Sequence, residues 1–86
     1  MFTAFFVPTG ENQGPRVGIT VPRALGGAVV RNRIKRRIRE AVRARLSVLS
    51  PQWQVVINPR RRALTAGFPE LVQEIEKLFL RCNAQR

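Results

Sequence analysis

The segment 28–46 constrains the fold more than any other stretch, because its apolar residues recur at every fourth position. These positions are Val30, Ile34, Ile38, Val42 and Leu46. At about 100° per residue, this spacing places all five side chains on one side of an α-helix. The segment is therefore predicted to be a helix with one buried face, and the rest of the chain must supply the core that covers it.

The other side of this predicted helix is almost wholly cationic. Residues 28–43 contain seven Arg or Lys residues and one acid, Glu40. Helical periodicity places Asn32, Arg36, Arg39 and Arg43 opposite the apolar stripe, Arg33 and Lys35 beside them, and Arg31 and Arg37 nearer the stripe. Like charges three or four residues apart repel by about 0.2–0.5 kcal/mol per pair. Such a face indicates a polyanionic partner.

The excess charge lies in the middle of the chain. The 86 residues carry a formal net charge of +11, and residues 16–62 hold thirteen basic residues against one acid. Fourteen of the sixteen basic residues are arginine, whose planar guanidinium suits phosphate oxygens. Nucleic-acid binding is therefore favoured over a merely solvated helix face, with Arg16, Arg23 and the basic segment 60–62 adding to the surface.

The segments 2–8, 16–22 and 53–58 are predicted to be strands, because they are rich in aromatic or β-branched residues and each is closed by a proline. We expect the first two to form an antiparallel hairpin across a turn at 9–15, and the order across 16–58 to be a parallel strand–helix–strand crossover. An exposed basic loop is expected at 60–62, and a last helix from about Pro69 to about Cys82. The prediction is one α+β domain over residues 1–86 with a small mixed sheet.

The first strand has two different faces. Thr3, Phe5 and Val7 lie on one side, and Phe2, Ala4 and Phe6 on the other. Both sides carry aromatic residues, so both are expected to meet something. An exposed aromatic sheet face favours stacking with single-stranded RNA. No helix-turn-helix partner precedes the basic helix and no zipper follows it, which weighs against DNA.

The residue types that protein catalysis needs are scarce. The sequence contains no His, Asp or Tyr, and the chain's serines therefore have no histidine to activate them. Glu70 and Glu74 could share a helix face, but they are interpreted as solvated surface. Cys82 is the only cysteine and is interpreted as a small core residue. We expect no catalytic side chains and no metal site in this chain.

The hydropathy of the chain bears on the cellular location of the protein and on whether the basic helix binds a membrane. No segment has the pattern of a signal peptide, and no apolar run is long enough to span a membrane, so a cytoplasmic protein without a membrane partner is expected. A basic amphipathic helix is also compatible with binding at a membrane surface. Its aliphatic stripe is needed for the core, which weighs against that alternative.

The stretch "RVGITVPRALGGAVVRNRIKRRIRE" resembles the protein component of bacterial ribonuclease P. The matching residues are Arg16, Gly18, Val21, Gly26, Ala28, Val29, Arg31, Asn32, Arg33, Lys35, Arg36, Arg39 and Glu40. The strand "WQVVINPR" and the last helix fit as well, so the resemblance covers nearly the whole chain. It implies a fold of the ribosomal S5 domain 2 type: a small mixed four-element sheet, a left-handed strand–helix–strand crossover and a C-terminal helix.

The resemblance also implies a function. In this family an RNA subunit hydrolyses precursor tRNA to remove its 5′ leader, and the protein docks on that RNA, grips the leader and raises the affinity for magnesium. The chain would then be a subunit of an endoribonuclease, with no tightly bound cofactor of its own and with magnesium used by the ribonucleoprotein. The alternative is another RNA-binding structural protein, such as a ribosomal or chaperone-like subunit.

The resemblance assigns roles to particular residues. The RNA-binding set is Arg16, Arg23, Arg31, Asn32, Arg33, Lys35, Arg36, Arg39 and Arg43, and the leader-binding set is Thr3 and Phe5. The family begins with a helix ahead of the first strand, and here Met1 precedes that strand almost directly. An uncovered sheet face around Phe5 is therefore expected to promote self-association.

Overall fold

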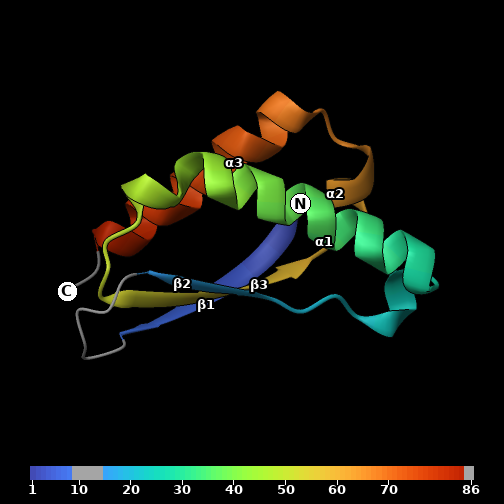
Figure 1. The fold of residues 1–86 in the computed structure, drawn as a ribbon, viewed down its shortest axis with the longest axis horizontal. Coiled ribbons are helices and arrows are strands. Elements are labelled where there is room, and N and C mark those ends of the chain that lie inside the picture. Colours follow the sequence, from blue (N-terminus) through green and yellow to red (C-terminus); the bar gives the residue numbers. More distant parts are fainter. Residues whose placement is uncertain (9–14, 85–86) are drawn as a thin grey trace.

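The computed structural model describes residues 1–8 and 15–84, which form a three-stranded sheet with helices on one face (Figure 1). The strands are β1 (Phe2–Pro8), β2 (Arg16–Ile19) and β3 (Trp53–Pro59), and the helices are α1 (Ala28–Arg45), α2 (Arg62–Thr65) and α3 (Phe68–Asn83). Short 3₁₀ turns occur at Arg23–Leu25 and Leu46–Val48. The α+β class and the predicted order of the main elements are confirmed.

The strand pairing corrects two predictions. The sheet order is β1-β3-β2, with β1 antiparallel and β2 parallel to β3, so the expected hairpin between the first two strands is wrong. The described residues form three strands, not a four-element sheet. β3 lies at the centre, so both of its edges are paired, and its alternate residues from Trp53 to Pro59 are buried on the helix-covered face. The turn predicted at 9–15 lies almost wholly outside the described residues.

Helices α1 and α3 cover one face of the sheet and form the core with it. The stripe residues Ile34 and Ile38 are fully buried, as are Val55 and Ile57 on β3 and Phe79 on α3. Trp53 packs edge-to-face against Phe6 of β1, with ring centroids 5.5 Å apart. The helix predicted over 28–46 is confirmed within one residue, and the core that its stripe requires comes from β3 and α3.

The turn into α1 depends on a glycine. Gly26 has φ +140°, a conformation that residues with a Cβ rarely adopt, and an added Cβ there would lie 3.1 Å from Cβ of Val30. Gly27 follows as the N-cap residue of α1. The pair "GG" therefore turns the chain sharply from the 3₁₀ turn into the helix and fixes where the helix begins.

Asn83 joins the end of α3 to the segment between α1 and β3. Its Oδ1 accepts a hydrogen bond from the Ser50 N–H at 2.8 Å, and its Nδ2 donates to the Val48 carbonyl at 2.6 Å. Two polar backbone groups of the loop are thereby satisfied by one side chain. This bond pair holds the last turn of α3 against the segment that precedes β3.

Cys82 is fully buried in the core, as the sequence predicts. Desolvation by burial raises the pKa of its thiol from 9.0 to about 11. We expect stability to fall as the pH rises from about 9 towards 11, because the unfolded thiol ionises first while the folded thiol keeps its proton. Unfolding measured by circular dichroism at pH 8, 9, 10 and 11 tests this. A Cys82→Ala variant is expected to lose less stability over that interval, and an equal loss would contradict the assignment.

Candidate nucleic-acid interface

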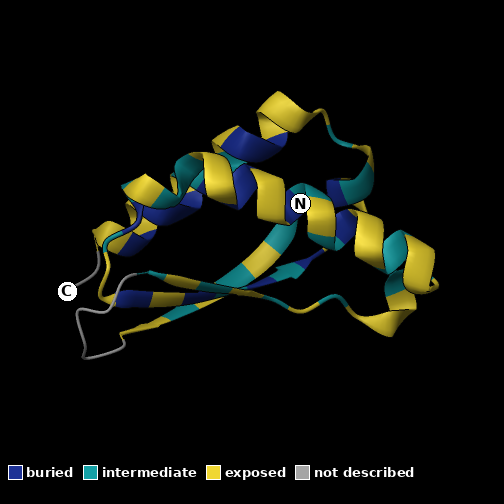
Figure 2. Ribbon diagram, in the orientation of Figure 1, coloured by how far each residue is buried: buried dark blue, intermediate teal, exposed yellow. Residues whose placement is uncertain are grey.

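The solvent side of α1 carries the cations that helical periodicity predicts. Figure 2 shows exposed and buried residues alternating along this helix, and Ile34, Ile38, Ala41 and Val42 are the buried ones. We define the basic face as Asn32, Arg33, Lys35, Arg36, Arg39 and Arg43, all of them exposed except the half-buried Lys35. Since helix α1 is continuous from Ala28 to Arg45, these side chains form one strip along it.

The charges of the basic face are not neutralised within the described part of the chain. The ion pairs there are Glu70–Arg62 at 2.8 Å, Glu74–Lys77 at 3.8 Å and Glu76–Arg45 at 3.8 Å. None of these pairs involves a residue of the basic face, and Glu40 is the only acid of α1. Glu70, Glu74 and Glu76 are thus paired with other cations, and the basic face keeps a net positive charge that an external anion would offset.

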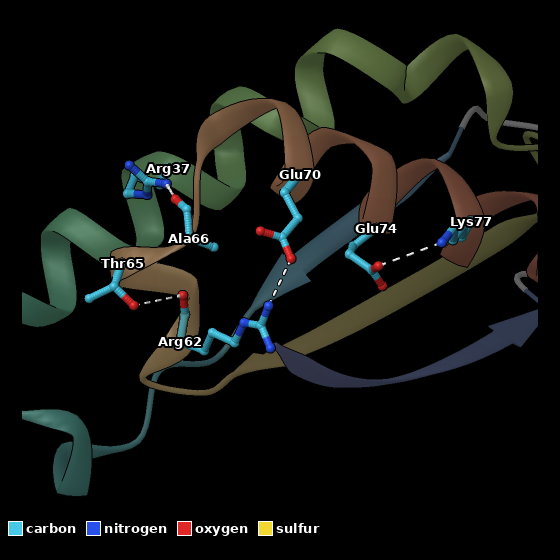
Figure 3. Close-up of polar contacts among 7 residues, drawn as sticks. All are labelled: Arg37, Arg62, Thr65, Ala66, Glu70, Glu74 and Lys77. Atoms are coloured by element: carbon cyan, nitrogen blue, oxygen red, sulfur yellow. Dashed lines mark hydrogen bonds and ion pairs between the residues drawn. The ribbon is translucent and has the colours of Figure 1, made fainter.

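Arg37 lies on the same helix but has a structural role. Its Nε donates a hydrogen bond to the Ala63 carbonyl at 3.1 Å, and Nη2 donates to the Ala66 carbonyl (Figure 3). These carbonyls belong to α2 and to the residue that caps it, so Arg37 fastens α1 to the segment leading into α3. The sequence places Arg37 near the apolar stripe and leaves it out of the RNA-binding set, but α2 and these contacts were not predicted.

Arg31 lies at the other edge of the apolar stripe. Its side chain is half-buried, and its Nε atom is buried without a hydrogen-bond acceptor among the described residues. Arg31 takes part in none of the ion pairs found among the described residues. At about 100° per residue, Arg31 and Lys35 share a side of α1 that Arg37 does not.

The open face of the sheet is the second candidate surface. We define the outer sheet face as the residues that point away from α1 and α3: Thr3, Phe5, Val7, Arg16, Gly18, Gln54, Val56 and Asn58. Register places Phe5 beside Val56 and Val56 beside Gly18, in one row across three strands. Phe5 is 54% exposed and Val7 52%. The side of the first strand that carries Thr3, Phe5 and Val7 is therefore not covered by other described residues, and its contact with a partner stays a prediction.

Gly18 has no side chain, so the backbone is open at its position on the outer sheet face. A Cβ added at Gly18 would meet no atom within 4 Å, so no internal contact requires a glycine there. A glycine in a strand interior often marks a place where a ligand approaches the backbone closely. The exposed ring of Phe5 and the open backbone at Gly18 together make a flat, partly apolar floor. Strand register does not follow from local spacing, and so Val56 and Asn58 were not predicted to belong to this surface.

The predicted site residues thus divide between two surfaces. The strip on α1 and the outer sheet face point in different directions, because α1 covers the opposite face of the sheet (Figure 1). Arg16 lies on the outer sheet face, and Arg23 is exposed in the 3₁₀ turn that leads from β2 towards α1. A hollow of about 390 Å³ borders this turn, lined by Thr3, Pro22, Ala24, Leu25, Asn58, Pro59 and Arg60.

The described part of the chain has neither a metal-binding cluster nor a membrane-spanning helix. Within residues 1–8 and 15–84, no group of three or more His, Cys, Asp or Glu side chains is placed to hold a metal ion. Among the helices of this part of the chain, none has the length and apolar character needed to cross a membrane. The two surfaces defined above remain the candidate site.

Comparison with known proteins places the chain in a family. A family model described as Ribonuclease P matches residues 1–83. The chain is 50% identical over 68 residues to the ribonuclease P protein component of Symbiobacterium thermophilum and 44% identical over 69 residues to that of Acidothermus cellulolyticus. These matches cover 79% and 80% of the chain but only 59% and 58% of the relatives.

Solved structures agree with the sequence matches. The ribonuclease P protein from Thermotoga maritima superposes with a TM-score of 0.81 at 28% identity, covering 93% of this chain and 76% of that one. The Staphylococcus aureus ribonuclease P protein gives a TM-score of 0.73 at 26% identity, over 96% of this chain and 74% of that one. The chain belongs to the ribonuclease P protein family.

Proposed function

We propose that this protein is the RNA-binding subunit of ribonuclease P, which acts in tRNA 5′-end maturation in the cytoplasm. In this proposal the basic face docks on the catalytic RNA, the outer sheet face binds the 5′ leader of precursor tRNA, and the RNA carries out the hydrolysis. The observation that carries it is the strip of un-neutralised cations on α1 in a member of this family.

The basic face suits an RNA backbone. Its guanidinium groups project from one rigid helix and each offers paired N–H donors to phosphate oxygens. Every phosphate that a cation neutralises releases counterions, so binding through this strip would weaken steeply with salt. Asn32 stands among the cations with an amide that both donates and accepts hydrogen bonds.

The outer sheet face suits a single strand. Phe5 offers an exposed ring on which a base can stack, and the open backbone at Gly18 lets a strand lie close to the sheet. Thr3 and Asn58 lie opposite one another in the register and add a hydroxyl and an amide for hydrogen bonds. This combination supports leader binding by stacking and shape.

Magnesium enters this proposal through the RNA. The described residues do not fit a protein-held magnesium site, because magnesium prefers oxygen ligands and α1 has one acid, Glu40, among its cations. The protein's own contribution is to bind and orient the RNA, and no proton transfer is assigned to its side chains.

Reconstitution tests this function. Mixed with ribonuclease P RNA at low magnesium, the chain is expected to restore removal of the leader from precursor tRNA, and the chain alone is expected to cleave nothing. Cleavage by the chain without RNA would contradict the proposal, as would a failure to stimulate the RNA.

A Phe5→Ala variant tests the leader site. We expect it to weaken binding of precursor tRNA by roughly 5- to 150-fold, because a base–aromatic stack contributes about 1–3 kcal/mol. Affinity for mature tRNA, which has no leader, should not change. Leu80→Ala on α3 is the matched control, since Leu80 is also apolar and 54% exposed. Equal losses in the two variants, or equal losses for the two RNAs, would contradict leader binding at Phe5.

A further inference from the structure

Strand β1 is an edge strand whose outer side has no partner strand in residues 1–8 and 15–84. The Arg60 N–H donates to the Met1 carbonyl at 2.8 Å, and Phe2 lies opposite Pro59, which has no N–H. In an antiparallel pair, residues that bond to the neighbouring strand alternate with residues that point away. The backbone N–H and C=O groups of Phe2, Ala4 and Phe6 therefore point outward from the sheet, where they can form hydrogen bonds with an added strand.

A groove runs beside this edge. The same three residues and the α3 residues Glu74, Lys77 and Arg81 help to line a pocket of about 360 Å³. Figure 3 shows Glu74 and Lys77 joined along α3, above the strands. The unpaired edge thus lies next to a hollow with an apolar floor and a rim of mixed charge.

We propose that the occupant of this edge is a second copy of the chain, paired antiparallel through β1 about a two-fold axis at Ala4. In that register Ala4 lies opposite Ala4 of the second copy, and Phe2 lies opposite Phe6. Each of the six outward N–H groups then finds a C=O partner, so the edge is self-complementary. The two sheets become one sheet of six strands.

The charges on α3 support the second copy as the occupant. Glu70, Glu74, Lys77 and Arg81 fall on one side of α3 within about 60° of arc at 100° per residue. Their order along the helix is acid, acid, base, base. An antiparallel two-fold arrangement places Glu70 towards Arg81 and Glu74 towards Lys77 of the second copy, so opposite charges meet. A parallel arrangement would bring like charges together.

The net charge of +11 does not oppose this contact strongly. The excess lies on α1, which contacts β2, the strand at the opposite edge of the sheet from β1. At 0.15 M ionic strength, exposed charges more than about 8 Å apart are largely screened. Pairing through β1 also leaves the basic face and the outer sheet face uncovered. The inference therefore stands apart from the proposed function, and the failure of one leaves the other intact.

Amide hydrogen exchange followed by NMR tests the edge directly. In the 86-residue chain we expect the N–H groups of Phe2, Ala4 and Phe6 to become protected as protein concentration rises. The N–H groups of Thr3, Phe5 and Val7, which face β3, should be protected at every concentration. A chain that stays monomeric in sedimentation, or a dimer formed through Phe5 and the outer sheet face without protection of the three edge amides, would overturn the proposal.

Charge exchange provides a second test. Glu74→Lys and Lys77→Glu should each weaken self-association by about tenfold or more, because each creates two like-charge contacts across the two-fold axis. Mixing the two variants should restore dimers, as heterodimers in which every contact joins opposite charges. The double variant E74K/K77E should dimerise like the parent. Both single changes lie on exposed or half-buried surface, and circular dichroism checks their folding. Mixtures that associate no better than the single variants would overturn the proposal.

Discussion

Replacing Arg36, Arg39 and Arg43 together by alanine is expected to weaken binding to ribonuclease P RNA by roughly 100- to 500-fold at 0.1 M salt. These side chains are exposed on the basic face and make no ion pair within the described ranges. Each phosphate contact contributes about 0.7–0.9 to the slope of log affinity against log salt. The triple variant should therefore lower that slope by about 2–3, as measured by filter binding between 0.05 and 0.3 M salt.

The control removes the same charge from another part of the surface. Arg45, Lys77 and Arg81 are also cations, but the first two are paired with Glu76 and Glu74, and all three lie outside the basic face. Their replacement by alanine should change affinity less than tenfold, since only the long-range field is reduced. Equal losses in the two triple variants would show that net charge alone drives binding and would contradict a docking strip on α1.

Arg37→Ala is expected to lower the free energy of unfolding by about 2–3 kcal/mol and the melting temperature by about 8–24 °C. Its guanidinium donates to the carbonyls of Ala63 and Ala66, and hydrogen bonds from charged donors contribute more than neutral ones. Loss of the side chain separates α1 from the segment that leads into α3. Thermal unfolding followed by circular dichroism measures this effect.

Arg36→Ala is the matched control, because Arg36 is the neighbouring arginine and is exposed. It should change stability by less than about 0.5 kcal/mol while reducing RNA affinity. The folded Arg37→Ala protein should bind RNA nearly as well as the parent. If Arg37→Ala leaves the melting temperature unchanged, the structural assignment of Arg37 is wrong.

Local periodicity predicted the elements that depend on neighbours in sequence. Helix α1 followed from its four-residue apolar spacing, and α3 from Pro69 and the seam that ends at Cys82. The hairpin was wrong because strand pairing depends on partners far apart in the chain: β1 pairs with Trp53–Pro59, across the whole of α1. Helix α2 was missed because its four residues are too few for a periodic pattern.

The same distinction applies to the candidate site. The basic face lies on one helix, and so its residues could be grouped from spacing alone. The outer sheet face needs the register of three strands, and the row of Phe5, Val56 and Gly18 appears only once that register is known. Helical spacing separates Arg37 from Arg36, but the hydrogen bonds of Arg37 depend on the carbonyls of Ala63 and Ala66, whose positions spacing does not predict.

The most direct test of the central claim uses a cleavage probe placed on the basic face. A Glu40→Cys variant carries an iron chelate among the arginines of α1, and Leu80→Cys carries it on the exposed side of α3. The native Cys82 stays unlabelled, because it is buried and its thiol pKa is raised to about 11. In complexes with ribonuclease P RNA, hydroxyl radicals from position 40 are predicted to cut the catalytic RNA at discrete sites, and those from position 80 to cut it weakly or not at all. Discrete cutting from position 80 with none from position 40 would contradict the account.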